Sequence, residues 1–148
     1  MNKTAIEFIK RFEGFRAMAY LCPANKLTIG YGTTTGVKIG QVVTEAQAEA
    51  LLVKDLLKFQ TKLDELVTAR LSDKQEAALL SFIYNVGITA FEISTLRKKL
   101  NLGDYQGAAK EFLRWDKVTD SKGIKKPLRG LTIRRDAENK LFLEGTRV

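Results

Sequence analysis

Residues 12–34 have the sequence FEGFRAMAYLCPANKLTIGYGTT and contain the sharpest change of pattern in the chain. A helical pattern ends before Gly14, a residue typical of the position just past a helix. Beyond it, Phe15–Leu21 and Leu27–Tyr31 have the composition of short strands around the turn Cys22–Lys26. The stretch therefore predicts a change from a helix to a β-hairpin.

Helical patterns flank the hairpin on both sides. Thr4-x-x-Glu7 predicts a capping box at the start of the first helix, whose apolar residues fill one continuous arc. After the hairpin, glycines interrupt the chain as far as Gly40, and Val37–Val43 is a possible third strand. From Thr44 onward the patterns are mostly helical.

The helices after residue 44 have clear start signals. Capping boxes at Thr44-x-x-Gln47 and Ser72-x-x-Gln75 open the first two of them. The segment Glu76–Val86 is apolar nearly all round, which predicts a buried central helix. The remaining expected segments are helices at Ser94–Leu100 and Tyr105–Trp115, a polar loop at Asp116–Lys126, and a last helix from Pro127, a residue favourable at the first helical position.

These elements predict a single α+β domain over residues 1–148 that is mostly helical. Its β-rich lobe spans about residues 15–43. Its helical lobe spans about residues 44–143 together with the first helix. The chain has 2 prolines and no low-complexity tract, which argues against a linker.

The residue inventory excludes several kinds of active site. No histidine is present, which excludes Ser–His and Cys–His nucleophile pairs and two-histidine zinc sites. The single cysteine excludes an internal disulfide and any CxxC cluster. If the protein is an enzyme, the side chains that transfer protons must be carboxylates, lysines, tyrosines or the one thiol.

The charge balance points to an anionic partner. The chain carries 25 Lys and Arg against 17 Asp and Glu, a formal net charge of +8. Such an excess is typical of proteins that meet nucleic acid, a lipid surface or an acidic polymer. The N-terminus has no apolar run of signal-peptide length, and no segment has the length of a membrane span, so we expect a chain that is cytosolic as made.

Glu13 is the first candidate for chemistry. It falls within the apolar arc of the first helix, in line with Ile6 and Ile9. Burial and the negative end of the helix dipole both disfavour its charged form, which suits a general acid. The alternative is a glutamate in a frayed last turn that bends outward to solvent.

The run from Phe12 to Thr34 resembles the catalytic segment of phage lysozymes, the muramidase endolysins of glycoside hydrolase family 24. Their pattern is a glutamate, eight residues, an aspartate or cysteine, five residues and a threonine; Glu13, Cys22 and Thr28 meet both spacings. The resemblance covers nearly the whole chain. It continues through Ser81–Gly87, Ser94–Leu96, Leu100–Tyr105, Arg114-Trp115 and the run Gly130–Leu143.

This resemblance implies a lysozyme-like fold and cleavage of the bond between N-acetylmuramic acid and N-acetylglucosamine in peptidoglycan. Glu13 would protonate the glycosidic oxygen, while Cys22 and Thr28 would hold or activate the attacking water. Acid and water would then lie on opposite faces of the sugar ring, as inversion demands. No metal or other cofactor is implied.

Cys22 stands where the best-known members carry aspartate, and its role stays open. An unperturbed thiol is mostly protonated near neutral pH. Cys22 is therefore a water-holder, a base when ionised, or a nucleophile that forms a covalent intermediate; a buried structural thiol is the remaining alternative. Thr33 stands where many relatives have histidine, and we interpret it as structural support of the site.

The family match also indicates substrate contacts and a partner for the acid. The positions that align with sugar-binding residues are Thr34, Tyr84 and Thr95. Tyr84 lies on the apolar helix, so a core position is the alternative for it. We expect Arg134 or Arg135 to pair with Glu13: helix geometry favours Arg135, and the ungapped match favours Arg134.

Two other functions remain as alternatives. A lytic transglycosylase, in which the sugar's own 6-hydroxyl attacks, would not need activated water. A basic nucleic-acid-binding module is disfavoured, because the positive charge is scattered through every segment. We therefore expect a monomer that cleaves peptidoglycan, contacts the anionic cell envelope and binds no nucleic acid. It would depend on a holin only indirectly, for release from the host cytoplasm to the periplasm and cell wall.

Overall fold

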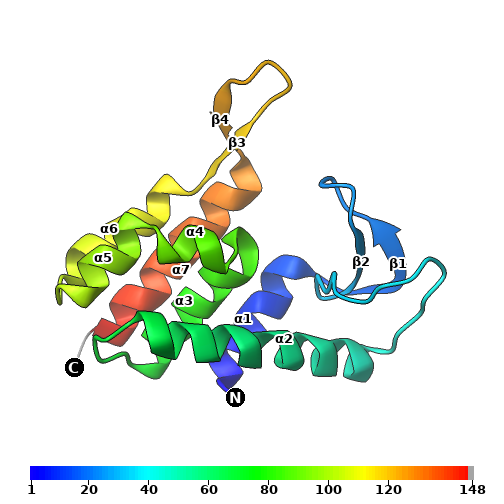
Figure 1. Ribbon diagram of the computed structural model, residues 1–148, viewed down its shortest axis with the longest axis horizontal. Coiled ribbons are helices and arrows are strands. Elements are labelled where there is room, and N and C mark those ends of the chain that lie inside the picture. Colours follow the sequence, from blue (N-terminus) through cyan, green and yellow to red (C-terminus); the bar gives the residue numbers. More distant parts are fainter. Residues whose placement is uncertain (147–148) are drawn as a thin grey trace.

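The computed structural model describes residues 1–146. Figure 1 shows a small β lobe and a larger helical lobe, with one long helix running between them. The elements in chain order are α1 (Lys3–Glu13), β1 (Arg16–Leu21), β2 (Leu27–Gly30), α2 (Glu45–Leu66), α3 (Asp73–Val86), α4 (Ile88–Glu92), α5 (Thr95–Asn101), α6 (Tyr105–Glu111), the 3-10 helix η1 (Phe112–Arg114), β3 (Lys117–Thr119), β4 (Lys125–Pro127) and α7 (Arg129–Thr146). The predicted α+β class, mostly helical, is confirmed.

The first hairpin forms where the sequence predicted it, within one residue at its outer ends. β1 and β2 are antiparallel and pair Tyr20 with Thr28 and Leu21 with Leu27. Asn25, in the connecting turn, has a left-handed φ of 63°, a conformation that asparagine tolerates well. The register therefore sets the turn close to Thr28.

The predicted third strand at Val37–Val43 is wrong. This segment contacts β1 through one isolated bridge between Met18 and Val42. Gly36 and Gly40 have left-handed φ angles of 70° and 81°, which are not strand conformations. The segment therefore lies beside β1 as a loop.

The start of α1 also differs from the prediction. Its N-cap is Asn2, and Thr4 lies inside the first turn. The Asn2 side chain accepts from the Ala5 N–H at 3.0 Å and donates to the backbone oxygen of Asp73 at 2.8 Å. The Asn2 side chain therefore caps the start of α1 and also contacts the first residue of α3. The sequence pattern of α1 alone cannot predict this tertiary contact. The predicted end at Gly14 is confirmed.

The capping boxes of α2 and α3 are confirmed. Thr44 accepts from the Gln47 N–H, and the Gln47 side chain accepts from the Thr44 N–H in return. Ser72 and Gln75 make the same reciprocal pair. Each box satisfies backbone donors that a helix N-terminus leaves free, so both starts are local properties of the sequence.

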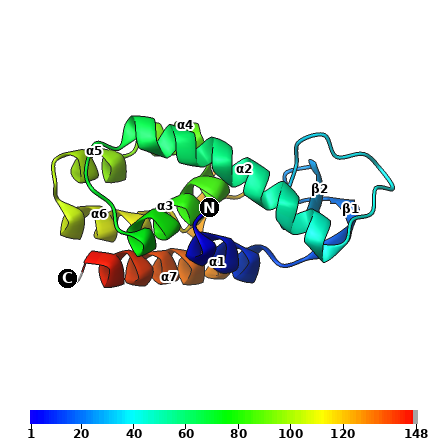
Figure 2. The same ribbon diagram turned by 90° about the horizontal axis from the view of Figure 1, so that it is seen from below.

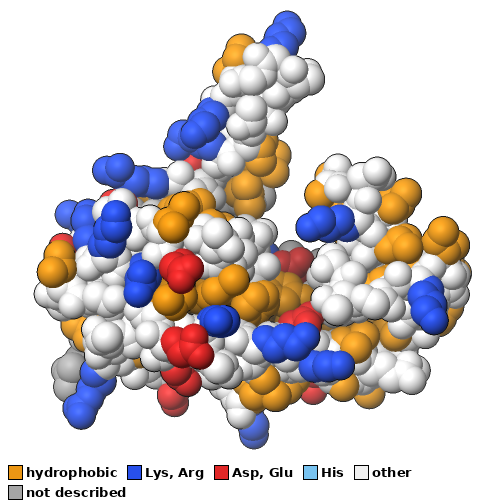
Figure 3. Space-filling view, viewed as in Figure 1, with side chains coloured by type: hydrophobic (Ala, Val, Ile, Leu, Met, Phe, Trp, Pro, Cys, Tyr) orange, Lys and Arg blue, Asp and Glu red, His pale blue; other side chains and the backbone are white. Residues whose placement is uncertain are grey.

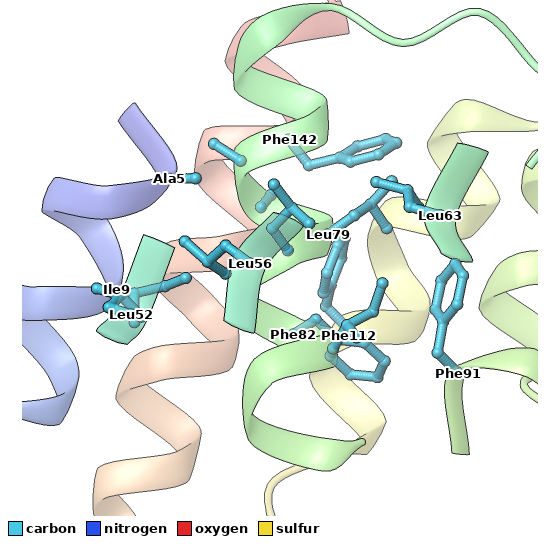
Figure 4. Packing of buried hydrophobic residues seen from close by; sticks show 14 of the residues in the cluster. Ala5, Ile9, Leu52, Leu56, Leu63, Leu79, Phe82, Phe91, Phe112 and Phe142 are labelled. Atoms are coloured by element: carbon cyan, nitrogen blue, oxygen red, sulfur yellow. The ribbon is translucent and has the colours of Figure 1, made fainter. Parts of the chain in front are cut away.

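α3 is the buried central helix that its composition predicted. It packs against α1, α2 and α7, and Figure 2 shows it between α2 and α7. Figure 4 shows Phe82 of α3 near Phe112 and Phe91, and all three side chains are fully buried. Burying a ring of this size stabilises the folded state by roughly 1.5–3 kcal/mol.

A second hairpin replaces the polar loop that was predicted at Asp116–Lys126. β3 and β4 are antiparallel, and Pro127 pairs with Lys117, so α7 begins at Arg129 and not at Pro127. Every residue of the two strands is exposed, so no alternation of apolar residues marked them in the sequence. Figure 3 shows this hairpin projecting from the helical lobe, across a hollow from the β lobe.

Two smaller differences concern the helices between these regions. The predicted helix Tyr105–Trp115 is divided into α6 and η1, and the short helix α4 was not predicted. None of the helices within residues 1–146 has both the length and the apolar character that a bilayer span requires.

Candidate active site

Glu13 is the last residue of α1, directly before the left-handed Gly14. Its Oε2 accepts a hydrogen bond from Arg134 Nη1 at 2.6 Å, so the contact joins α1 to α7. The Glu13 side chain is 21% exposed and that of Arg134 is 6% exposed. The expected arginine partner is therefore present, and Glu13 is half-buried against a guanidinium from a distant helix.

Arg134, rather than Arg135, makes this pair. Arg135 is fully buried over the ring of Phe82, and its Nε lies 2.8 Å from Oε1 of Glu138. Burial lowers the pKa of Arg135 to about 10, while the Glu138 charge acts in the opposite direction. Helix geometry thus predicted the inward direction of Arg135, but its acidic partner is Glu138 and not Glu13.

Glu138 connects the two arginines to α3. Its Oε2 accepts from the Ser81 hydroxyl at 2.6 Å and lies 3.5 Å from Arg134 Nε. Arg134 also donates to the backbone oxygen of Ser81 at 3.2 Å. Burial raises the pKa of Glu138, and Arg135, Ser81 and Arg134 oppose that rise. The two acids, Glu13 and Glu138, therefore balance the charge of the two arginines. The cluster holds the Arg134 guanidinium beside Glu13.

Gly32 lies against the other oxygen of Glu13. It has a φ of 92°, and a Cβ at this position would lie 2.8 Å from Glu13 Oε1 and 3.3 Å from the Tyr84 hydroxyl. Only glycine combines this backbone angle with room for the carboxylate. The sequence contained no specific signal for this role, because Gly32 is one of several glycines in its segment and the contact is made across space.

Tyr84 and Thr33 lie around the same point. The Tyr84 hydroxyl donates to the backbone oxygen of Tyr31 at 2.8 Å. Burial raises the pKa of Tyr84, the nearby Glu13 charge adds to the rise, and the Thr33 hydroxyl opposes it. Thr33 is itself buried. Thr33 thus lies beside Tyr84 and directly follows Gly32, the residue that contacts Glu13; its supporting role stays a prediction.

Cys22 and Thr28 belong to the first hairpin. The Cys22 N–H and the Thr28 hydroxyl both donate to the backbone oxygen of Lys26, each at 3.0 Å. Hydrogen bonds with the Lys26 backbone and with the Thr28 side chain lower the pKa of the Cys22 thiol. Cys22 is half-buried, and Thr28 is buried. The thiol is therefore neither a core residue nor unperturbed, and its thiolate is favoured relative to a free cysteine.

The three predicted substrate positions line two neighbouring hollows. Thr34 and Tyr84 line one of about 340 Å³, which also includes Lys26 and Gly32. Thr95 lines another of about 600 Å³ at the base of the second hairpin. The first hollow is thus adjacent to Glu13 through Gly32, and it includes a residue of the Cys22 turn. Tyr84 lines this hollow and also packs, partly buried, against the core, so both interpretations of it hold in part.

Asn85 forms part of both hollows and was not predicted as a site residue. Its Oδ1 accepts from Arg135 Nη2 at 2.8 Å, which fixes the side chain from the core side. The sequence did contain one sign of a role for Asn85, because it is a polar amide near the end of an otherwise apolar helix. Within residues 1–146, no group of three or more His, Cys, Asp or Glu side chains is arranged to hold a metal ion.

Comparisons with known proteins agree with this geometry. The family model described as phage lysozyme matches residues 10–138. The chain is 44% identical over 142 residues to an endolysin of Acyrthosiphon pisum secondary endosymbiont phage 1, covering 96% of this chain and 97% of that relative.

Solved structures are similar over the same span. The muramidase domain of SpmX from Asticaccaulis excentricus superposes with a TM-score of 0.90 at 37% identity, covering 95% of each chain. An endolysin from Escherichia coli O157:H7 phage FAHEc1 superposes with a TM-score of 0.88 at 36% identity, covering 96% of this chain and 92% of that one. With the glutamate, cysteine and threonine of the motif on one helix end and one hairpin, the chain belongs to the phage lysozyme family.

Proposed function

We propose that this protein is an endolysin that hydrolyses the β-1,4 bond between N-acetylmuramic acid and N-acetylglucosamine in host peptidoglycan. Membership of the phage lysozyme family supports the hydrolase class and the substrate. The observation that carries the residue assignment is the position of Glu13. One of its oxygens is held by Arg134, and the other lies beside Gly32, a residue that lines the hollow of about 340 Å³.

Glu13 acts as the general acid in this proposal. The sugar enters the hollow lined by Thr34 and Tyr84. Its glycosidic oxygen comes near Glu13 Oε1, which lies behind Gly32 of the same hollow. In the reacting complex Glu13 carries a proton, which passes to the leaving oxygen as the C–O bond breaks. Arg134 then stabilises the carboxylate that remains, without having to move to reach it.

Cys22 and Thr28 supply the water on the other face of the sugar. Thr28 and the Cys22 side chain hold and orient the water that attacks the anomeric carbon. The proton of this water passes to solvent or, where Cys22 is ionised, to its thiolate. The hydrogen bonds that lower the pKa of Cys22 support this proton transfer. A single displacement by water inverts the anomeric configuration, whereas attack by sulfur would retain it.

The wider setting is also a proposal. Residues 1–148 act as one catalytic domain and as a monomer, without a metal or cofactor and without nucleic acid. The protein waits in the host cytoplasm and reaches the wall after a holin opens the inner membrane, so the holin acts only indirectly. The net charge of +8 supports attraction to the anionic cell envelope.

The decisive experiment compares Glu13→Gln with Glu7→Gln in a turbidity assay on permeabilised Gram-negative cells. Both variants change one glutamate of α1, but Glu7 is 74% exposed. We expect Glu13→Gln to lose roughly 10²–10⁴-fold in rate, because glutamine cannot deliver a proton. Glu7→Gln should remain within a few-fold of wild type. Comparable rates for the two variants would refute the assignment of Glu13.

The products identify the reaction class. Mass spectrometry of digested peptidoglycan should show reducing ends that include the added water. Products lighter by one water would instead identify a lytic transglycosylase. A salt-sensitive DNA shift with no wall lysis would identify a nucleic-acid-binding module.

A further inference from the structure

Four large apolar side chains of the β lobe are exposed to solvent, and we call them the apolar edge: Met18, Leu21, Ile39 and Val42. Each is between 61% and 88% exposed. They are not part of the buried core, and neither of the two hollows described above includes them. Single apolar residues are normal on a protein surface, whereas a group within one small lobe marks an interaction surface.

Backbone contacts bring these four residues together from two segments of the chain. Met18 of β1 forms an isolated antiparallel bridge with Val42 of the following loop. Hydrogen bonds on either side of this bridge hold the loop antiparallel to β1, so the turn that contains Ile39 comes next to the Leu21 end of the strand. Figures 1 and 2 show this loop at the end of the molecule remote from α5 and α6.

The charged residues of the β lobe are all basic. Residues 14–44 contain Arg16, Lys26 and Lys38, and all 17 acidic residues of the chain lie outside this segment. Lys38 is exposed and directly precedes Ile39, and Arg16 is exposed at the start of β1. Figure 3 shows Lys and Arg side chains among the hydrophobic ones on this lobe. The apolar edge is therefore accompanied by positive charge.

Arg16 also has an aromatic partner. Its guanidinium carbon lies 4.2 Å from the centroid of the Tyr20 ring, and Tyr20 is half-buried. Tyrosine and arginine both combine an apolar body with a polar end, which suits a boundary between water and lipid.

The combination of apolar and basic side chains favours one kind of partner. Basic residues alone would suit any anionic polymer, and apolar residues alone would suit another protein. An anionic bilayer presents phosphates at its surface and hydrocarbon directly beneath them, so it matches both parts of the surface. A second copy of the chain is disfavoured, because a symmetric dimer would bring the same basic residues of two lobes together.

We propose that the apolar edge docks the protein on an anionic lipid bilayer. Ile39 and its apolar neighbours enter the boundary between headgroups and acyl chains, while Lys38 and Arg16 contact lipid phosphates. This surface is distinct from the hollows beside Glu13, and the inference does not depend on the muramidase function. It gives the proposed attraction to the cell envelope a defined place on the molecule.

Two matched pairs of variants test the apolar and the basic contributions separately. Ile39→Ser is compared with Leu102→Ser, because Leu102 is 84% exposed but lies directly after α5 in the helical lobe. Lys38→Gln is compared with Lys98→Gln, because both lysines are exposed and Lys98 belongs to α5. Each pair loses the same kind of side chain, and the lysine variants have equal net charge. All four residues are outside the proposed catalytic machinery.

Binding is measured by cosedimentation with vesicles of phosphatidylglycerol and phosphatidylcholine, and pure phosphatidylcholine vesicles are the uncharged control. We expect wild type to bind the anionic vesicles and to bind the uncharged ones much more weakly. Ile39→Ser should bind the anionic vesicles roughly tenfold more weakly, and Lys38→Gln about fivefold more weakly. Leu102→Ser and Lys98→Gln should match wild type.

Three outcomes would overturn the proposal. These are equal losses within either matched pair, no binding of wild type to anionic vesicles, or a dimer in analytical ultracentrifugation that Ile39→Ser dissociates, which would identify a second copy as the occupant.

Cleavage of soluble peptidoglycan fragments separates docking from catalysis. We expect Ile39→Ser and Lys38→Gln to cleave these fragments at the wild-type rate. A loss of cleavage in parallel with the loss of vesicle binding would assign the apolar edge to the glycan and would contradict lipid docking. If wild type binds the vesicles but cleaves no glycan, the muramidase assignment fails and the docking proposal stands.

Discussion

Glu13 and Cys22 are proposed to act on opposite faces of the same sugar, but they are held in different ways. Glu13 is held by Arg134, which follows 121 residues later and is supported by the buried Glu138 and Ser81. Cys22 is held within one turn, because its N–H donates to the backbone oxygen of Lys26, which also accepts from the Thr28 hydroxyl. The acid therefore depends on the packing of three helices, whereas the water-holding side depends on local hairpin geometry.

This difference predicts the largest effect in the buried cluster. Glu138→Ala should lower the free energy of unfolding by about 3–5 kcal/mol, because it leaves the fully buried Arg135 without its acidic partner. Glu144→Ala on the same helix is the control, since Glu144 is 53% exposed and pairs with Lys74. It should cost less than about 1 kcal/mol. Urea unfolding measures both, and similar losses would contradict the role given to the cluster.

The contact of Gly32 with Glu13 predicts a smaller effect, on activity. Gly32→Ala and Gly36→Ala both place a side chain at a left-handed φ, which costs about 1–2 kcal/mol in each case. Only Gly32→Ala directs its Cβ at Glu13, because the space around Gly36 is open. A displaced acid should reduce kcat by roughly 10²-fold. Gly36→Ala should retain nearly full activity per folded molecule, and equal losses would rule out steric displacement of Glu13.

The smallest effects are expected on the hairpin side, where a local substitution can keep the geometry. Cys22→Ser should retain measurable activity, because a hydroxyl still orients water, and Cys22→Asp should match or exceed wild type by restoring a carboxylate base. If the thiolate is the base, wild-type activity falls as the pH drops through the thiol pKa, which lies below its ordinary value. Cys22→Asp should stay active at lower pH, because a carboxyl ionises near pH ~3.9.

The stereochemistry of the first product tests the same residue independently. Proton NMR of the first-formed anomer should show inversion. A retained anomer, or a sugar adduct on Cys22 in intact-protein mass spectra, would make the thiol a nucleophile and would overturn the water-holding role.

Sequence patterns predicted well those features whose causes are local. The capping boxes at Thr44 and Ser72, the helix end at Gly14 and the first hairpin all have the expected positions within a residue. Each depends on groups only a few residues apart, so all the interacting groups lie within one short segment of the sequence. The apolar composition of α3 likewise predicted its central position, because such a helix must be buried on all sides.

Features that depend on contacts between distant residues, or that consist of fully exposed residues, were not predictable from sequence patterns. Asn2 caps α1 partly through its contact with α3, and the strands at residues 117–119 and 125–127 bury nothing that would mark them. The position of Gly32 against Glu13 arises from contact across space. None of these leaves a periodic pattern in the sequence.

The choice between Arg134 and Arg135 separates what the sequence determines from what only tertiary packing decides. The sequence by itself determined the helix, the two adjacent arginines and the candidate acid Glu13, because these follow from motif and periodicity. Only the tertiary structure decided which arginine reaches Glu13, because adjacent helical residues differ by about 100° in direction and each direction leads to an acid, the half-buried Glu13 or the fully buried Glu138. The approach of α1 and Ser81 of α3 assigned Arg134 to Glu13, and Glu138 took Arg135.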